Sequence, residues 1–236
     1  MPRRDDIESI MVLGSGPIKI GQAAEFDFSG SQAVRALRED GYKVILVNSN
    51  PATIQNDPEM ADVVYIEPLL PDTVAKILEK ERPCALLAGM GGQTALNIAS
   101  ELSHNGTLER LGVELIGSDL DAIDKAEDRE LFNQVCESIN LPISQAVACN
   151  SIDEVIAAAK LIGSWPILIR PAFTLGGLGG GTARDMGELV EISQLGLRNS
   201  RISQVLIEES ILGWQELEYE VMRDEADNAT IVCTME

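Results

Sequence analysis

A glycine-rich loop that follows an arginine is the segment of this sequence best suited to chemistry. Residues 170–182 read RPAFTLGGLGGGT, and five of the six positions from 176 to 181 are glycine. Glycine has no Cβ atom, so such a backbone can approach a polyphosphate closely and direct N–H groups toward its oxygen atoms. Arg170 adds a fixed positive charge at the start of the loop. These residues predict a phosphate-binding loop, although glycine density alone is equally typical of a flexible surface loop.

A second glycine motif, Gly14-Ser15-Gly16, follows the first apolar run. A dinucleotide-binding fingerprint would need glycine at position 19, which is Lys19, and an acidic residue at the end of the second strand, where the sequence reads NSN. NAD binding is therefore disfavoured, and we interpret this loop as a tight strand exit whose N–H groups could hold a small anion. The sequence also contains no GxxxxGK followed by Ser or Thr, which excludes a P-loop NTPase.

Acidic residues follow a later apolar run. Glu208 and Glu209 come directly after residues 205–207, and their carboxylates could accept hydrogen bonds from ribose hydroxyls or an adenine amino group. Glu216, Glu218 and Glu220 alternate along one predicted strand, so they face the same side. For Glu218 and Glu220, the solvent face of an edge strand is an equally good interpretation.

The first half of the chain alternates short apolar runs with amphipathic segments. Helices are predicted over 29–41, over 71–81 and over 93–102, because their apolar residues recur at helical spacing. The runs between them predict buried strands at 10–13, 44–47, 63–66, 85–88 and 113–116. Alternating strands and helices indicate an α/β fold with a parallel sheet, whose ligands bind beyond the carboxyl ends of the strands.

The pattern changes after about residue 120. A long helix is predicted over 121–139, and a helix beginning at Ser151 carries Glu154 at capping-box spacing. Strands are predicted at 145–148, 167–169 and 205–208, a helix at 186–197, and a hairpin from 216–222 and 230–234. This is an α+β arrangement, so we predict two domains, 1–122 and 123–236.

Composition excludes several classes of function. With 18 basic and 38 acidic residues, the formal net charge is −20, which disfavours binding to DNA or RNA. No apolar run approaches the roughly 20 residues of a membrane helix, and no secretory signal is visible at the start, so we expect a cytoplasmic protein. The single histidine, His104, lies in a polar segment, which disfavours mechanisms that need a catalytic histidine.

Six motifs in this order are similar to the amino-terminal part of the carbamoyl-phosphate synthase large-subunit family. They are GSGPIKIGQAAEFDFSGSQA, NSNPATIQNDPEMAD, GMGGQTALN, DKAEDRELF, IRPAFTLGGLGGG and EESILGWQELEYEV. The resemblance implies a Rossmann-like preATP-grasp domain followed by part of an ATP-grasp domain. It implies an ATP-dependent ligase that phosphorylates bicarbonate to carboxyphosphate. Ammonia from a glutaminase small subunit then attacks carboxyphosphate to give carbamate, with release of phosphate, and the product is used for arginine and pyrimidine biosynthesis. The remainder of the large subunit is a further implied partner.

The resemblance also implies residue roles. Arg129 and Arg170 match the arginines that contact the ATP phosphates, and these are the two candidate catalytic residues. Gly176 and Gly177 match the glycines of the phosphate loop. The residues alone would not single out Arg129, because an arginine on a helix is usually a solvated partner of a nearby acidic residue.

The adenosine side of the site is implied by three further positions. Glu209 and the backbone of Ile211 resemble contacts to adenine, and Glu216 resembles a ribose-binding carboxylate. The family uses Mg²⁺ or Mn²⁺, whose ligands we expect beyond residue 236, so we expect residues 1–236 alone to be inactive. Two alternatives stay open: another ATP-grasp carboxylate ligase such as a biotin carboxylase relative, or a non-catalytic nucleotide-binding or assembly module.

Overall fold

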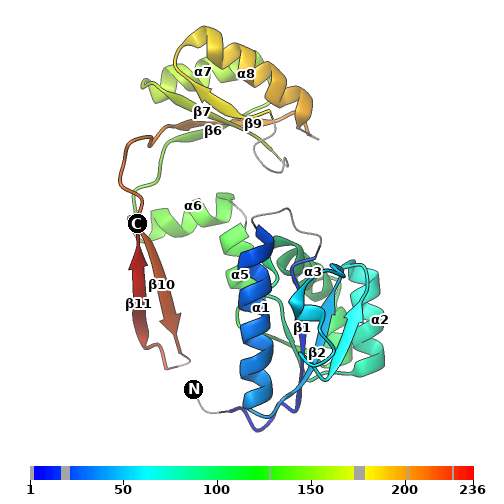
Figure 1. The fold of residues 1–236 in the computed structure, drawn as a ribbon. Helices are drawn as coiled ribbons and strands as arrows, with labels where there is room; N and C mark the ends of the chain where they lie inside the picture. Colours follow the sequence, from blue (N-terminus) through cyan, green and yellow to red (C-terminus); the bar gives the residue numbers. More distant parts are fainter. Residues whose placement is uncertain (1–2, 17–21, 128, 173–178, 201, 225) are drawn as a thin grey trace. The chain divides into compact units, whose positions relative to one another are not determined.

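The protein is described by a computed structural model that covers residues 3–236 except 17–21, 128, 173–178, 201 and 225. The side chains of residues 22–25, 127, 129 and 130 also lie outside the description. The chain forms two compact units, Met1–Asn140 and Leu141–Glu236, which Figure 1 shows in sequence colours. Each unit is described by itself below.

The first unit contains a five-stranded parallel sheet, as the sequence predicts. The strand order is β3-β2-β1-β4-β5: the chain adds β2 and β3 on one side of β1, then crosses back after β3 and adds β4 and β5 on the other side. The strands are β1 (Ser9–Leu13), β2 (Lys43–Asn48), β3 (Val63–Ile66), β4 (Ala85–Leu87) and β5 (Glu114–Ile116). All four pairings are parallel, which confirms the predicted α/β fold class.

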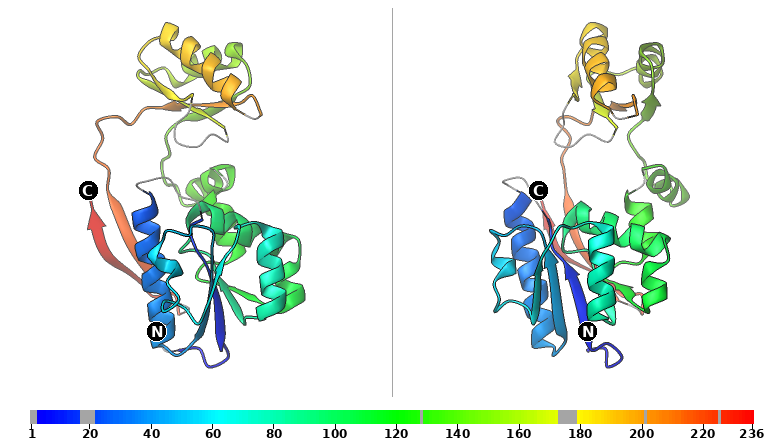
Figure 2. Two further views of the ribbon diagram at one scale, coloured as in Figure 1. Left: turned by 45° about the vertical axis from the view of Figure 1, so that its right-hand side comes forward. Right: turned by 90° about the vertical axis from the view of Figure 1, so that its right-hand side faces the viewer.

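Helices cover both faces of this sheet, which explains why its strands are apolar at nearly every position. Helix α1 (Gln22–Glu39) places Val34 against Ile10, Val12 and Leu46 on one face. The opposite face packs against α2 (Pro71–Glu81), α3 (Gly92–His104) and α4 (Thr107–Leu111). Figure 2 shows the sheet between these two helical layers.

Local sequence signals set the ends of α2. Pro71 occupies the first turn, where its missing N–H group is not needed. Arg82 ends the helix in the left-handed conformation, with φ +48°, and its N–H group donates to the carbonyl of Leu78. The observed helix therefore has the bounds that the sequence predicts.

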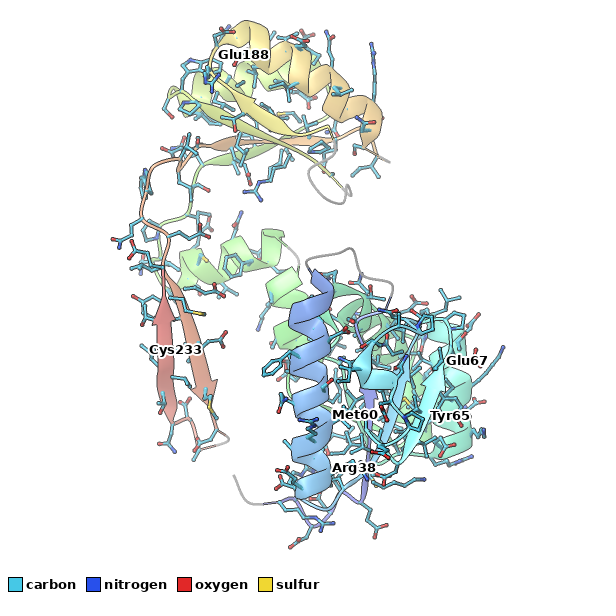
Figure 3. The ribbon with its side chains drawn as sticks, in the orientation of Figure 1. Arg38, Met60, Tyr65, Glu67, Glu188 and Cys233 are labelled. Carbon is cyan, nitrogen blue, oxygen red and sulfur yellow. The ribbon has the colours of Figure 1, made fainter. Side chains whose placement is uncertain are left out.

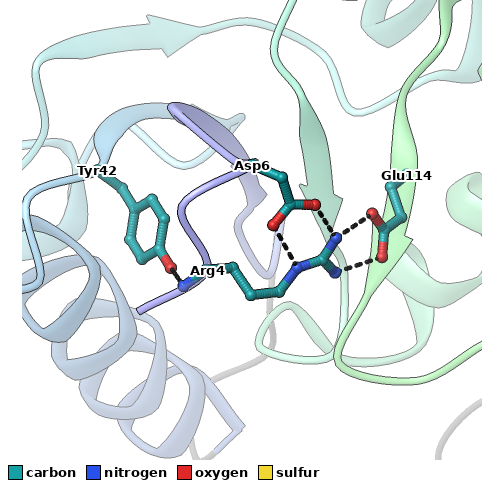
Figure 4. Close-up of polar contacts among 4 residues, drawn as sticks. All are labelled: Arg4, Asp6, Tyr42 and Glu114. Atoms are coloured by element: carbon teal, nitrogen blue, oxygen red, sulfur yellow. Dashed lines mark hydrogen bonds and ion pairs between the residues drawn. The ribbon is translucent and has the colours of Figure 1, made fainter. Parts of the chain in front are cut away.

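The amino-terminal segment is held to the first unit by Arg4. Its guanidinium donates to both carboxylate oxygens of Asp6 and of Glu114 on β5, and its backbone N–H donates to the Tyr42 hydroxyl at 2.8 Å (Figure 4). The Arg4 guanidinium holds the pKa of Asp6 below its usual value. Because these groups are solvent-exposed, the contacts position the segment more than they stabilise the fold.

The helix predicted over 121–139 is present as α5 (Leu120–Glu127) and α6 (Arg129–Ser138), and residue 128 lies outside the described residues. The short helix α4 and the 3₁₀ turn η1 (Ile54–Asn56) have no counterpart in the sequence-based prediction. No described helix is long and apolar enough to cross a membrane.

The second unit is built around a four-stranded antiparallel sheet in the order β6-β9-β7-β8. Its strands are β6 (Ala146–Cys149), β7 (Ile167–Pro171), β8 (Gly181–Ala183) and β9 (Val205–Glu209). Helices α7 (Ile152–Ile162) and α8 (Met186–Asn199) pack on one face (Figure 1). At the start of α7, the Ser151 hydroxyl accepts a hydrogen bond from the Glu154 N–H at 3.3 Å, so the predicted N-cap is confirmed.

The same unit contains the predicted hairpin, formed by β10 (Glu218–Arg223) and β11 (Ala229–Met235). The register shifts between Glu220 and Val221, which indicates a bulge. Side chains of both strands are exposed in the described structure, including the alternating Glu218 and Glu220.

Candidate functional site

The face of the four-stranded sheet opposite α7 and α8 carries the residues suited to binding. Successive side chains of a strand point to opposite faces, so Ile167, Ile169 and Ile207 pack under the helices and their neighbours point the other way. We call this second side the open face. Its residues are half-buried or exposed, and they are Ala146, Ala148, Leu168, Arg170, Thr182, Leu206 and Glu208.

An ion pair lies at the centre of the open face. Register places Arg170 of β7 opposite Leu206 and Leu168 opposite Glu208, so Arg170 and Glu208 are diagonal neighbours. Arg170 Nε lies 2.6 Å from Glu208 Oε2. The Arg170 side chain is 55% exposed and that of Glu208 is 12% exposed. The carboxylate therefore anchors a guanidinium whose remaining donors are accessible to an anionic ligand.

Glu209, the acidic residue named from sequence, lies on the other side of the strand. Its N–H donates to the Gln145 carbonyl at 2.8 Å, and its carboxylate accepts from the Gln145 N–H at 3.5 Å. Because Glu208 and Glu209 are consecutive in β9, their side chains leave opposite faces. The sequence shows the acidic pair, but the sequence-based prediction assigns only Glu209 to the site. Glu208 could have been found from its spacing, because it is two residues after Leu206 in the same strand and therefore shares the open face with it.

Ile211 and Glu216 lie in the segment that joins β9 to β10. Ile211 is 57% exposed, and its carbonyl accepts a hydrogen bond from the Trp214 N–H at 3.0 Å. Glu216 is exposed as well. Both residues are thus accessible within the second unit, and their role at a nucleotide stays a prediction.

The glycine loop joins two adjacent strands of the sheet. Strand β7 ends at Pro171, directly after Arg170, and β8 begins at Gly181 and pairs antiparallel with β7. Gly176 and Gly177 lie outside the described residues. Arg129 is the first residue of α6, and its side chain lies outside the description.

The Gly14-Ser15-Gly16 loop of the first unit is less open to an anion than its sequence indicates. The Gly16 N–H donates to Asn48 Oδ1 at 3.0 Å, so this donor is already used within the protein. A Cβ atom built at Gly14 would lie 2.5 Å from Asn48 Cγ, which shows how closely Asn48 packs here. Glycine at position 14 is therefore explained by packing, because the residue that follows β1 lies directly against the Asn48 side chain at the end of β2.

No group of three or more His, Cys, Asp or Glu residues suited to a metal ion occurs in the described part of the chain. The open face instead offers one guanidinium, one anchored carboxylate and half-buried apolar side chains. This combination suits an anion attached to an apolar or aromatic body.

Two domain families match the sequence. The family described as "Carbamoyl phosphate synthase preATP-grasp domain" matches residues 6–125. The family described as "Carbamoyl-phosphate synthase L chain, ATP binding domain" matches residues 128–236. The chain belongs to the carbamoyl-phosphate synthase large-chain family. The open face, with β7, β8 and β9, lies within the part that matches the family's ATP-binding domain.

Curated relatives of this family agree over the whole chain. The carbamoyl phosphate synthase large chain of Methanothrix thermoacetophila is 57% identical over 236 residues, and that of Archaeoglobus fulgidus is 59% identical over 236 residues. These alignments cover 100% of this chain and 22% of each relative. The chain thus spans about a fifth of the length of the curated relatives that it matches.

Solved structures with a similar fold include biotin carboxylases. The biotin carboxylase domain of Hydrogenobacter thermophilus 2-oxoglutarate carboxylase, in complex with MgADP, ADP and bicarbonate, has a TM-score of 0.72 and 18% identity. The structural alignment covers 98% of this chain and 50% of the carboxylase domain. Campylobacter jejuni biotin carboxylase has a TM-score of 0.73 at 18% identity, with coverages of 97% and 50%. At this identity the similarity shows the fold shared by the synthase family and the carboxylases.

Proposed function

We propose that this chain contributes the first ATP site of a glutamine-dependent carbamoyl-phosphate synthase, where ATP phosphorylates bicarbonate. In this reaction a bicarbonate oxygen attacks the γ-phosphorus of ATP, and the bond between the γ-phosphorus and the oxygen that bridges to the β-phosphate breaks. The products are carboxyphosphate and ADP. The observation that carries the proposal is the position of Arg170 on the open face, next to the glycine loop. Family membership supplies the substrate class.

Arg170 is proposed to bind the phosphates electrostatically. Phosphoryl transfer needs little covalent help from a protein, because positioning and charge stabilisation supply most of the catalysis. Glu208 uses the Nε side of the guanidinium, at 2.6 Å. The Nη donors are then directed by a fixed partner, which reduces the entropy lost when a phosphate binds.

The other site residues complete the proposed site. Arg129 would contact phosphate as the second catalytic arginine, and the backbone at Gly176 and Gly177 would cover the phosphates. Further proposed contacts go to the adenosine portion of ATP. Glu209 ends β9 with its side chain on the side away from the open face, so we propose that it reaches adenine at the end of the strand, together with the backbone of Ile211. The Glu216 carboxylate would accept hydrogen bonds from ribose.

Mg²⁺ or Mn²⁺ is part of the proposal, because a divalent cation neutralises charge on the transferred phosphoryl group. The H. thermophilus carboxylase domain carries MgADP and bicarbonate on a similar fold, which supports ATP, magnesium and bicarbonate as ligands. The open face fits the organic part of ATP, since Leu168 and Leu206 are half-buried beside Arg170. We assign no metal ligand to the described residues.

The proposed partners are a glutaminase small subunit that supplies ammonia and the remainder of a large subunit. The proposed setting is the cytoplasm, and the proposed pathways are arginine and pyrimidine biosynthesis. We also propose domain limits of 1–122 and 123–236 for the preATP-grasp and ATP-grasp parts.

Calorimetric titration of the chain with MgATP tests this proposal. Replacing Arg170 with alanine is expected to weaken ATP binding roughly tenfold to a hundredfold, because a hydrogen bond to a charged group contributes about 1.5–3 kcal/mol. Arg184→Ala is the matched control, since Arg184 is exposed and follows β8 at the end away from the glycine loop. ATP binding that is equal in wild type and Arg170→Ala would contradict the proposal.

A further inference from the structure

Three polar side chains join the end of helix α3 to helix α5, and they meet at the carboxylate of Asp124. Asp124 Oδ1 accepts a hydrogen bond from the Ser100 hydroxyl at 3.1 Å, and Asp124 Oδ2 lies 3.0 Å from His104 Nε2. Ser100 and His104 lie one helical turn apart on α3, so they share a helix face and reach the same partner. We call these three residues the α3–α5 clamp.

The clamp contains the single histidine of the chain, His104. Histidine is the side chain that ordinarily changes its charge between about pH 5 and pH 8. Among the described residues, the other ion pairs that join separate segments of the first unit use arginine or lysine, which stay charged over this range. Arg38 of α1, for example, donates to the Met60 carbonyl at 3.0 Å, and Figure 3 labels both residues. The α3–α5 clamp is therefore the contact that can respond to pH.

Protonation of His104 strengthens the clamp. A neutral imidazole can donate one hydrogen bond through Nε2, whereas the imidazolium donates the same bond and also places a positive charge beside the Asp124 carboxylate. The side chain of His104 is 59% exposed and that of Asp124 is 32% exposed. Solvent screens a pair this exposed, so we expect the added charge to change equilibria by about twofold.

Other charged residues around α3 have partners of their own. Helices α2, α4 and α5 pack against α3. Lys125 of α5 pairs with Asp121 on the same helix, and Arg110 of α4 pairs with Glu79 of α2 at 2.9 Å. The remaining charged residues of α2, α3 and α4 are Asp72, Lys76, Lys80, Glu81, Glu101 and Glu109. Within the described part of the chain, Asp124 is the carboxylate at ion-pair distance from His104.

Helix α5 determines where α6 begins. Residue 128 alone separates the two helices, and in the residues that the structure describes α5 is the element that α6 packs against most extensively. Ile123, next to Asp124, is 5% exposed, which shows that α5 is docked on the first unit. Arg129 is the first residue of α6. A clamp that holds α5 on α3 therefore also restrains the backbone at Arg129.

We propose that Asp124 is a positioning residue for the ATP site, because the α3–α5 clamp fixes α5 and the Arg129 backbone, and fixes them more firmly when His104 is protonated. This inference rests on the proposed function, since it needs Arg129 to contact the phosphates of ATP. An arginine on a better-fixed backbone loses less conformational freedom when a phosphate binds. The affinity for ATP therefore rises as His104 gains its proton.

Methyl NMR between about pH 5 and pH 8 tests the clamp itself, with Ile123 as the reporter of α5. The Ile123 resonances are expected to titrate in the wild-type chain and not in His104→Gln, because glutamine can still donate a hydrogen bond but gains no charge. Asp124→Asn keeps an acceptor for Ser100 and is expected to remove most of the titration.

Asp121→Asn is the matched control for this experiment. It removes a carboxylate that lies on the same helix and pairs with Lys125 outside the clamp, so the Ile123 titration is expected to remain. Absence of the titration in the wild-type chain, or its persistence in His104→Gln, would overturn the proposal.

Calorimetric titration with MgATP at about pH 6 and about pH 8 tests the link to the ATP site. The affinity of the wild-type chain divided by that of His104→Gln is expected to be about two at the lower pH and about one at the higher pH. This ratio cancels the protonation of ATP itself. Asp121→Asn is expected to match the wild-type chain at both pH values. A ratio that is the same at both pH values would overturn the positioning role.

Arg129→Ala separates this inference from the proposed function. Weaker ATP binding by Arg129→Ala, together with a ratio that does not change with pH, would refute the positioning role and leave the proposed function in place. Unchanged ATP binding by Arg129→Ala would contradict the proposed phosphate contact, and the positioning role would fall with it.

Discussion

Replacing Arg170 and Glu208 singly and together measures the coupling free energy of their ion pair on the open face. At 2.6 Å and an effective dielectric constant of about 20, the gross attraction is about 6 kcal/mol. Solvent screens much of it, because the arginine is 55% exposed, and desolvation of the 12% exposed carboxylate opposes the rest. We therefore expect a net coupling free energy of about 1–2 kcal/mol, between the values of about 0.2–1 kcal/mol for exposed pairs and about 1.5–7 kcal/mol for close pairs at interfaces.

Urea unfolding read by tryptophan fluorescence gives this coupling. Both tryptophans of the chain, Trp165 and Trp214, lie in the second unit, so their signal reports that unit separately from the first. The variants are Arg170→Met, Glu208→Gln and the double substitution, and Arg184→Met is the control for loss of an exposed arginine. Glu208→Gln is expected to weaken ATP binding by less than Arg170→Met does, since the guanidinium remains. A coupling free energy below about 0.3 kcal/mol would refute the view that Glu208 anchors Arg170.

Three further outcomes are expected. Gly91→Ala should destabilise the first unit by about 2–4 kcal/mol in thermal unfolding. An added Cβ would lie 2.5 Å from the Leu13 carbonyl oxygen and 2.6 Å from that of Gly14, at the end of β1. An unchanged unfolding midpoint would show that the backbone shifts to accommodate the methyl group. The Tyr65 hydroxyl donates to Glu81 at 2.6 Å and lowers the pKa of that carboxyl below its usual 4.5. This stabilisation is present above about pH 4.5 and is lost as pH falls through the lowered pKa, so Tyr65→Phe should cost about 1 kcal/mol at pH 7 and flatten the acid limb of stability against pH. Burial raises the pKa of the Cys149 thiol to about 11, whereas Cys233 is exposed. A thiol reagent at pH 8 should therefore label Cys233 first and Cys149 only on unfolding, and early labelling of Cys149 would contradict its burial.

Much of the fold follows from residue periodicity. The strand at 63–66 and the helix at 71–81 are predicted with their observed bounds, because an apolar run and an amphipathic stripe each have clear flanking signals. The strand Gly181–Ala183 was missed, since three residues beside a glycine loop carry no pattern of their own and become a strand only by pairing with β7. Helix α1 begins seven residues before its predicted start at 29, in a segment without a strong apolar stripe.

The candidate site is predictable in part. Arg170 follows from its place at the end of an apolar strand beside the glycine loop. Its partnership with Glu208 depends on the antiparallel register of β7 and β9, which joins residues 38 positions apart and is set by tertiary packing.

Methyl NMR of the chain during MgATP titration tests the central claim most directly, namely that the open face receives ATP. Leu168 and Leu206 point to the open face, whereas Ile169 and Ile207 are buried under α7 and α8. We expect ATP to shift the two leucine methyl resonances strongly and the two isoleucine resonances little, with the leucine shifts weakened in Arg170→Ala. ATP-dependent shifts confined to the helix-covered face, or to the first unit, would contradict the account.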